Sequence, residues 1–208
     1  MDLSYIVPTF IAFGCWSFLW ITLLVLPPGP IAIVSTYRLN FLHGVICCIV
    51  ATMCLYDYIP DNITSMCTIS YFIIDFINIL INDFYWKAPS YQSPQNRRME
   101  YFHHIFCCFF GICSGAFHTY GCHSFKHDPF IQFMYAEFST PFLMIWRYYK
   151  HDVLGGIFVI TFFCCRILYH SLILVPTCIS NCDSYLGYGF GVPYTVMNVY
   201  FMVMIMRR

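Results

Sequence analysis

Apolar residues run along the chain in segments of helix length, separated by short polar or proline-containing stretches. A helix that spans a bilayer needs roughly 20 mostly apolar residues, and each segment is near that length. The segments are residues 5–26, 39–56, 66–85, 101–120, 130–146, 153–178 and 188–206. We therefore predict an all-α, polytopic membrane protein with about seven transmembrane helices.

The first segment is set apart from the others by the run Pro27-Pro28-Gly29-Pro30, which stops a helix. Asp2 is the only charge ahead of this segment, so the basic region that opens a cleaved signal sequence is missing. We expect an N-terminal transmembrane helix with its linker, residues 1–36, followed by one larger domain, residues 37–208.

Composition and charge restrict the class of protein further. Hydrophobic residues make up 60% of the chain and charged residues only 10%, against roughly a quarter charged in an average soluble domain. Ten basic and ten acidic residues cancel, so no net positive charge is available for nucleic acid. We expect an integral membrane protein without a nucleic-acid partner and without a cofactor.

The basic residues are distributed unequally between the loops. Eight of them follow the first, third and fifth segments or end the chain, whereas the other loops carry only Lys126. The eight are Arg38, Lys87, Arg97, Arg98, Arg147, Lys150, Arg207 and Arg208. Because basic loops stay on the cytoplasmic side, we expect a cytosolic C-terminus in the endoplasmic reticulum or another endomembrane, or a matrix-side C-terminus in the mitochondrial inner membrane.

Thirteen cysteines suggest a disulfide framework at first, but most of them fall inside the apolar segments. The pairs Cys47-Cys48, Cys107-Cys108 and Cys164-Cys165 are typical of small apolar side chains that pack between helices. Cys122 and Cys182 lie in loops on the same side of the membrane, where a bridge between them is an open alternative.

Several ionisable or amide side chains lie inside the apolar segments, where they are costly unless they face a protein interior. Asp75 shares a helix face with Tyr71 and Asn78 by spacing. The others are His103, His104, Glu137, Arg166 and Asn198. These groups predict a polar intramembrane cavity, with polar packing between helices as the alternative. Because an unpaired buried charge is expensive, Arg166 should meet Asp75 or Glu137.

Five strings occur in an order that resembles the TLC-domain family, which includes the ceramide synthases and the translocating-chain-associating membrane proteins. They are Tyr71-Phe72-Ile73-Ile74-Asp75, Glu100-Tyr101-Phe102-His103-His104, Ala136-Glu137-Phe138-Ser139-Thr140-Pro141-Phe142, Phe162-Phe163-Cys164-Cys165-Arg166 and Asn198-Val199-Tyr200-Phe201. The likeness is greatest to the small TLC-domain-containing members. It implies a six-helix core around a lipid cavity that includes Thr140, preceded here by one extra helix.

The resemblance also implies a catalytic role for the histidine pair. In ceramide synthases the paired histidines belong to the acyl-transfer site, which would place that role on His103 and His104, with Asp75 orienting an imidazole. However, this chain continues from the pair with the apolar run Ile105-Phe106-Cys107-Cys108-Phe109-Phe110-Gly111, where ceramide synthases have a polar run. Lipid binding is therefore favoured over acyl transfer.

Metal chemistry is the other candidate. His118, Cys122, His123, His127 and Asp128 gather in one loop, but their spacing matches no standard zinc motif. Adjacent histidines on a helix point about 100° apart, which does not suit a shared ion. We therefore expect no metal.

Three functions remain open. The first is lipid binding, in which the cavity handles an acyl chain, sphingolipid or phospholipid and regulates membrane lipid composition. The second is a structural accessory subunit of a larger membrane assembly, such as a respiratory complex. The third is an acyltransferase that uses the histidine pair. The sequon Asn62-Ile63-Thr64 falls in a loop on the non-cytosolic side and lies too near the membrane to be modified efficiently.

Overall fold

The computed structural model describes residues 3–25, 32–85, 94–112, 125–181 and 185–207, and within these ranges it is helical and contains no strand. The elements are α1 (Leu3–Val25), α2 (Ala32–Leu55), α3 (Asp61–Leu80), η1 (Ile81–Tyr85), α4 (Pro94–Gly111), α5 (Pro129–Phe133), η3 (Met134–Ser139), α6 (Thr140–Tyr149), α7 (Asp152–Phe162), η4 (Phe163–Leu174), α8 (Val175–Asn181), η5 (Tyr185–Gly191) and α9 (Val192–Met206). The predicted all-α class is confirmed.

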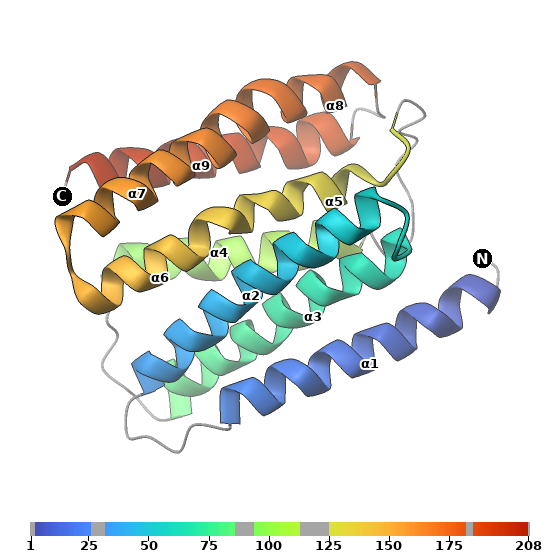
Figure 1. Cartoon of the computed structure of the whole chain (residues 1–208), viewed down its shortest axis with the longest axis horizontal. Helices are drawn as coiled ribbons and strands as arrows, with labels where there is room; N and C mark the ends of the chain where they lie inside the picture. The colour runs from blue at the N-terminus through green and yellow to red at the C-terminus, as the bar shows by residue number, and fades with distance from the viewer. Residues whose placement is uncertain (1–2, 26–31, 86–93, 113–124, 182–184, 208) are drawn as a thin grey trace.

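Elements that follow one another without a break form continuous rods, namely α3–η1, α5–η3–α6, α7–η4–α8 and η5–α9, beside the single helices α1, α2 and α4. Figure 1 shows these rods running alternately in opposite directions, with α1 at one edge of the bundle and the two ends of the chain at opposite ends. This alternation brings the segments around Arg38, Arg97 and Arg147 to the end of the bundle that holds the C-terminus.

Five helical stretches of the described chain are long and apolar enough to cross a membrane. They are Ile6–Leu23, Tyr37–Leu55, Asp61–Phe84, Asp152–Asn181 and Tyr188–Met206, and they identify an integral membrane protein. The predicted segments 101–120 and 130–146 are not among them. The first continues past the described residues, and the second is interrupted by Gln132, Glu137 and Ser139. The count of seven spans stays a prediction.

Three of the irregular helical segments, though not η1, are followed closely by a proline. The 3₁₀ segment η3 ends two residues before Pro141, and the π-helical segments η4 and η5 end two residues before Pro176 and Pro193. A proline inside a helix has no N–H to donate and its ring pushes away the carbonyl of the preceding turn, so that turn must tighten or widen. Glu137 lies in η3 and Arg166 in η4, so these two buried charged residues occupy irregular turns.

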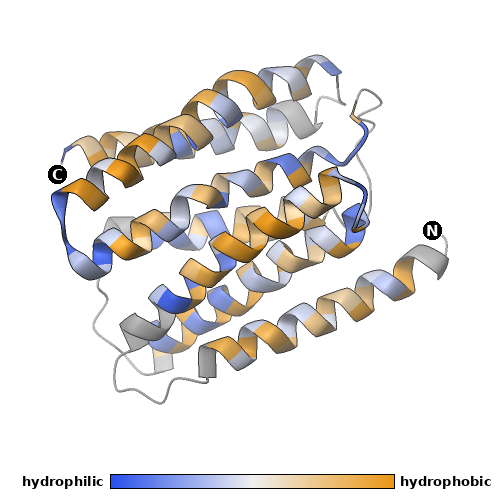
Figure 2. Cartoon of the chain, viewed as in Figure 1, coloured by the Kyte–Doolittle hydropathy of each residue, from blue (hydrophilic) through white to orange (hydrophobic). Residues whose placement is uncertain are grey.

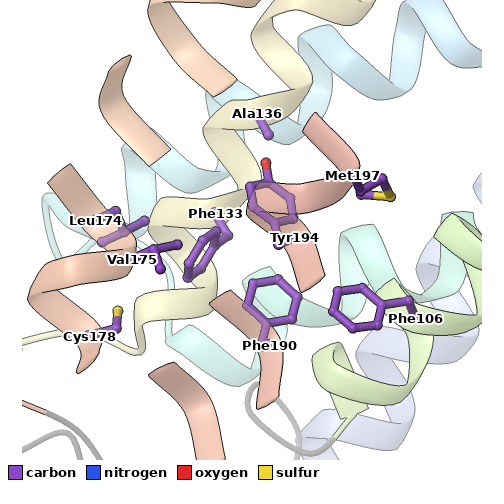
Figure 3. Close-up of a cluster of buried hydrophobic side chains, with 9 residues drawn as sticks. All are labelled: Phe106, Phe133, Ala136, Leu174, Val175, Cys178, Phe190, Tyr194 and Met197. Carbon is purple, nitrogen blue, oxygen red and sulfur yellow. The ribbon is translucent and has the colours of Figure 1, made fainter. Parts of the chain in front are cut away.

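Apolar side chains fill the bundle between the rods and also cover its outside. One buried cluster joins α4, α5 and the last two rods through Phe106, Phe133, Val175, Phe190 and Tyr194, with the Tyr194 ring in its middle (Figure 3). Large hydrophobic side chains are also exposed along the rods, among them Phe18 and Ile160. Figure 2 shows hydrophilic residues where α2 turns into α3 and where α6 meets α7. This distribution suits a surrounding lipid phase.

The predicted cysteine pairs contribute to this core only in part. Cys47 and Cys107 are buried, Cys48, Cys108 and Cys165 are half-buried, and Cys164 is exposed. The described cysteines carry free thiols. Cys122 and Cys182 lie outside the described residues.

Two contacts attach α1 to the rest of the bundle through α3. The Trp20 indole N–H donates to the Cys67 carbonyl at 3.0 Å, and the Asn62 amide donates to Thr9 Oγ1 at 2.8 Å. Asn62 is therefore buried in a helix interface, which corrects its interpretation as a loop sequon. A buried amide that already has a partner is inaccessible to a glycan-transferring enzyme in the folded protein.

Gly44 allows α2 to approach η3 and α6 closely. A Cβ at this position would lie 2.6 Å from Pro141 Cδ and 2.9 Å from the Glu137 carbonyl oxygen. The close approach carries the neighbouring His43 into the interior, where its ring is fully buried.

Candidate functional site

A cavity of about 190 Å³ lies inside the bundle, bordered by residues from α2, α3, α4 and the last three rods. One part of its wall is polar and consists of Asn40, Tyr71, Asp75, Glu100, His103, His104, Glu137, Ser139, Thr140, Arg147 and Arg166. The other part is apolar and includes Leu143, Met144, Phe158, Phe162, Phe201, Met204 and Ile205. For scale, an engineered apolar cavity of about 150 Å³ binds benzene. The space therefore suits a small polar group together with part of a hydrocarbon chain.

His104 is held at both of its ring nitrogens. Its Nε2 lies 2.9 Å from Asp75 Oδ2, and its Nδ1 lies 2.8 Å from the Glu100 carbonyl oxygen. The carbonyl can only accept, so Nδ1 carries a proton and donates it. Asp75 orients this imidazole, as the sequence predicts.

One further proton must lie between His104 Nε2 and Asp75 Oδ2, because two unprotonated acceptors would repel each other at 2.9 Å. The two residues then form either an imidazolium–carboxylate pair or a neutral imidazole–carboxylic acid pair. The sum of their charges is zero in both cases. Such a pair is far less costly at membrane depth than a lone carboxylate.

Asp75 retains hydrogen-bonding capacity beside the cavity. Its Oδ2 also faces the Tyr71 hydroxyl at 3.4 Å, and that hydroxyl donates to Asn40 Oδ1 at 2.8 Å. Asp75 Oδ1 is buried and has no hydrogen-bond partner within the residues that the structure describes. An unsatisfied buried acceptor costs about 1–3 kcal/mol, so a ligand that donates a hydrogen bond here would gain that free energy.

His103 lies next to His104 along α4, but its ring has a different environment. It packs edge-on against Phe72 and His104, and its Nδ1 lies 3.5 Å from Cys107 Sγ. A thiol is a weak hydrogen-bond donor. Of the two adjacent histidines, His103 is therefore the one with capacity left to exchange a proton with a molecule in the cavity.

Arg166 and Glu137 form the second polar pair of the interior. Arg166 Nη2 donates to Glu137 Oε1 at 3.1 Å, and Arg166 Nε donates to the Ala136 carbonyl at 3.0 Å. Thr140 Oγ1 donates to Glu137 Oε2 at 2.7 Å. Of the two partners predicted for Arg166, the structure selects Glu137.

His43 adds an imidazole that the sequence reasoning overlooked. Its ring stacks on Tyr71 with 3.4 Å between ring centroids, and its Nδ1 lies 3.9 Å from Glu137 Oε2. Neither ring nitrogen has a hydrogen-bond partner within the described part of the chain. His43 therefore links the Asp75 side of the polar cluster to the Glu137 side, through the Tyr71 ring on one face and the Glu137 carboxylate at its edge.

A second layer of charged side chains holds the first turns of α4. Arg97 donates to Asp83 Oδ1 at 2.7 Å and Oδ2 at 2.8 Å, and also to Glu100 Oε2 at 2.6 Å. Burial disfavours the charged guanidinium, but these bonds outweigh it and raise the pKa of Arg97 above its ordinary value. Tyr101 donates to Asp83 at 2.5 Å. The network fixes Glu100, whose carbonyl orients His104.

The predicted site residues separate into two groups. Seven of them border the cavity, namely Tyr71, Asp75, His103, His104, Glu137, Thr140 and Arg166. Two do not. Asn78 accepts a hydrogen bond from Asn82 at 3.0 Å, and Asn198 donates to the Arg166 carbonyl at 3.5 Å. Asn198 therefore supports the η4 backbone behind the cavity wall.

Asn40, His43 and Ser139 belong to the site or its immediate surroundings and were missed. A sequence signal existed for the first two. Asn40 and His43 are polar, lie inside the apolar segment 39–56 and are three residues apart, which places them on one helix face. Ser139 carries no such signal, because a lone serine is common in membrane helices.

Comparison of the chain with protein-family models, with curated proteins and with solved structures found no match.

Proposed function

We propose that this integral membrane protein is a TLC-domain-like protein that binds a membrane lipid in its intramembrane cavity and thereby regulates membrane lipid composition. The observation that carries the proposal is the division of one cavity wall into a polar and an apolar part. A lipid has the same division, because a polar group with hydrogen-bonding atoms is joined to a hydrocarbon chain.

The polar part suits a lipid group that can both donate and accept hydrogen bonds. Asp75 Oδ1 is an acceptor without a partner in the described chain, and His103 can accept or donate a proton. Arg166 is already engaged by Glu137. We therefore expect a hydroxyl, amide or carboxylic acid group to bind beside Asp75 and His103.

The apolar part suits a hydrocarbon chain. Phe158, Phe162, Phe201 and Met204 border it from α7 and α9. The hydrocarbon chain of a membrane lipid already lies in an apolar phase, so this wall contributes shape complementarity and van der Waals contact rather than transfer free energy.

Native mass spectrometry of the gently extracted full chain tests this proposal. We expect a retained lipid in the natural protein and loss of that lipid in Asp75→Asn, which has nearly the same shape but changes the charge and adds N–H donors where the ligand must donate. The matched control is Asp152→Asn, an exposed carboxylate at the start of α7, which should keep the lipid. Equal retention in both variants would contradict lipid binding at this site.

The same experiment separates lipid binding from an accessory-subunit role. If the chain is recovered only within a larger assembly, and Asp75→Asn leaves that assembly intact without changing its lipid content, the cavity serves packing alone and the subunit role is favoured.

Acyl transfer is a second candidate, favoured by the environment of His103. Both nitrogens of His104 are engaged by protein groups, whereas His103 meets only the weak Cys107 donor among its described hydrogen-bonding neighbours. In such a reaction His103 would take the proton from an attacking hydroxyl or amine. An acyl-transfer assay should then show a large loss in His103→Ala, while lipid retention persists. Equal activity in the natural protein and His103→Ala would exclude this role.

We also propose an orientation of the protein in its membrane. The bundle end that carries the C-terminus faces the cytosol, or the matrix if the membrane is mitochondrial. This rests on the basic residues near that end, among them Arg38, Arg97, Arg147 and Lys150. Protease digestion of a C-terminal epitope tag in sealed vesicles tests it, because the tag should be cleaved from the cytosolic face.

A further inference from the structure

Three side chains with metal-binding atoms meet at the end of the bundle where α2 turns into α3. Cys54 lies in the last turn of α2, Asp61 is the first residue of α3, and His127 directly precedes Asp128, the cap of α5. Their donor atoms all lie within 4.8 Å of one another. Figure 1 shows the α2–α3 turn and the start of α5 side by side at this end. The cluster shares no residue with the wall of the cavity.

The spacing of the three donor atoms matches one face of a tetrahedral zinc site. Cys54 Sγ lies 3.2 Å from Asp61 Oδ1 and 3.9 Å from His127 Nδ1, and the latter two atoms are 2.9 Å apart. Zinc bonds of about 2.0 Å to nitrogen and oxygen and about 2.3 Å to sulfur, set at tetrahedral angles, require separations of about 3.3 to 3.5 Å. Adjustments of a few tenths of an ångström would bring the three atoms to those separations.

The surroundings supply the outer partners that metal ligands need. Asp61 Oδ2 accepts the Asp128 backbone N–H at 2.6 Å, which fixes the carboxylate. His127 Nε2 lies 3.5 Å from Asp57 Oδ1, and Lys126 contacts the other oxygen of Asp57. At this distance Nε2 makes no hydrogen bond within the described residues. A histidine ligand usually donates its second ring N–H to a carboxylate, and Asp57 is the carboxylate beside Nε2. Asp57 adopts a positive φ of 64° in the turn, the left-handed conformation that places its carboxylate beside His127.

We propose that Cys54, Asp61 and His127 form a zinc site, with water completing the tetrahedral shell. Binding of one Zn²⁺ releases the Cys54 thiol proton to solvent. It also moves the His127 proton from Nδ1, which becomes the ligand, to Nε2. The Nε2–H group then donates a hydrogen bond to the Asp57 carboxylate. The site combines thiolate, imidazole and carboxylate donors, a set that zinc accepts and that calcium or magnesium does not.

An ion bound at this site would connect separate parts of the chain. The three ligands come from the end of α2, the start of α3 and the residue before the α5 cap, so one ion would join three parts of the chain that are separated by up to 73 residues in sequence. A bound ion stabilises the folded state because the unfolded chain lacks the assembled site. The site therefore clamps the bundle end that lies opposite the C-terminus.

Metal analysis of the purified full chain in detergent tests the proposal. After removal of metal and addition of Zn²⁺, we expect one tightly held equivalent in the natural protein and its loss in Cys54→Ser and His127→Gln. Co²⁺ in place of Zn²⁺ should give a thiolate-to-cobalt charge-transfer absorption that disappears in Cys54→Ser. The matched control is Cys67→Ser, a buried cysteine of the core cluster around Trp20, which should keep both signals.

A second variant guards against a simple folding defect. Asp57→Asn leaves all three ligands in place, removes the carboxylate beside His127 Nε2 and also breaks the ion pair between Asp57 and Lys126. Zinc should then bind about 10- to 100-fold more weakly. Equal zinc content in Cys54→Ser and the natural protein would overturn the proposal. So would a cobalt complex without thiolate absorption.

Discussion

Removal of the Arg166 charge is the sharpest test of the interior that the structure describes. In Arg166→Met the guanidinium is replaced by an apolar side chain, and Glu137 stays behind with Thr140 as its remaining donor at 2.7 Å. Both side chains of the pair are about nine-tenths buried, with exposed fractions of 8% and 10%.

The size of the effect follows from the geometry. At a separation of 3.1 Å and an effective dielectric constant of about 20, the attraction between two unit charges is roughly 5 kcal/mol. Measured losses for one partner of a buried pair are about 3–5 kcal/mol. We expect Arg166→Met to lower the free energy of unfolding by that amount.

The assay is an unfolding titration in mixed detergent micelles, followed by a spectroscopic signal from the helices. Arg38→Met is the matched control, because Arg38 is exposed near the start of α2 and its loss should stay within about 0.5 kcal/mol. The purified variants must be compared in the same detergent, since micelle composition changes the reference state.

The double variant Glu137→Met with Arg166→Met separates pairing from packing. If an orphaned carboxylate causes the loss, removal of that carboxylate should restore much of the stability. Two results would refute the reasoning. One is a double variant that loses the sum of both single effects, and the other is an Arg166→Met variant no less stable than Arg38→Met.

Other predictions concern packing and accessibility. Gly44→Ala should lower the free energy of unfolding by about 1–3 kcal/mol, because the new methyl group overlaps the neighbouring rod. Gly14→Ala has open space around the new methyl group and should raise it by up to about 1 kcal/mol. Thermal unfolding of the two variants checks this, and equal melting temperatures would count against the close approach. Asp83→Asn should cost about 2 kcal/mol, since the charge-assisted bonds from Arg97 are weakened or lost, and the same detergent titration measures it. Asn62 should carry no glycan because it is buried, so glycosidase treatment should leave the electrophoretic mobility unchanged. A mobility shift that Asn62→Gln abolishes would show that the interface between α1 and α3 is open.

Sequence patterns predicted much of the fold for reasons that are local to the chain. The apolar segments around residues 39–56, 153–178 and 188–206 are long enough that no other element suits them. The interior polar groups could be listed as well, because an ionisable residue inside an apolar segment has few low-cost positions other than a protein interior.

Partner choice within that interior could not be predicted. Arg166 was equally compatible with Asp75 and with Glu137, because the sequence does not give the rotation and axial offset of helices that lie far apart along the chain. The structure brings η4 against η3, so Arg166 meets Glu137, and it brings α4 against α3, so Asp75 takes His104. His103 is one residue away and about 100° around the helix, so it does not pair with Asp75 and borders the cavity instead.

The sequence by itself therefore determined that this is a helical membrane protein with buried acids, bases and amides, because composition and periodicity act within single segments. Tertiary structure alone decided which of those groups neutralise each other and which face the cavity. It also brought Cys54 and Asp61 to His127, residues that no spacing rule connects. The physical reason is that hydrogen bonds and ion pairs act over about 3 Å, a scale set by helix packing and invisible to the order of residues along the chain.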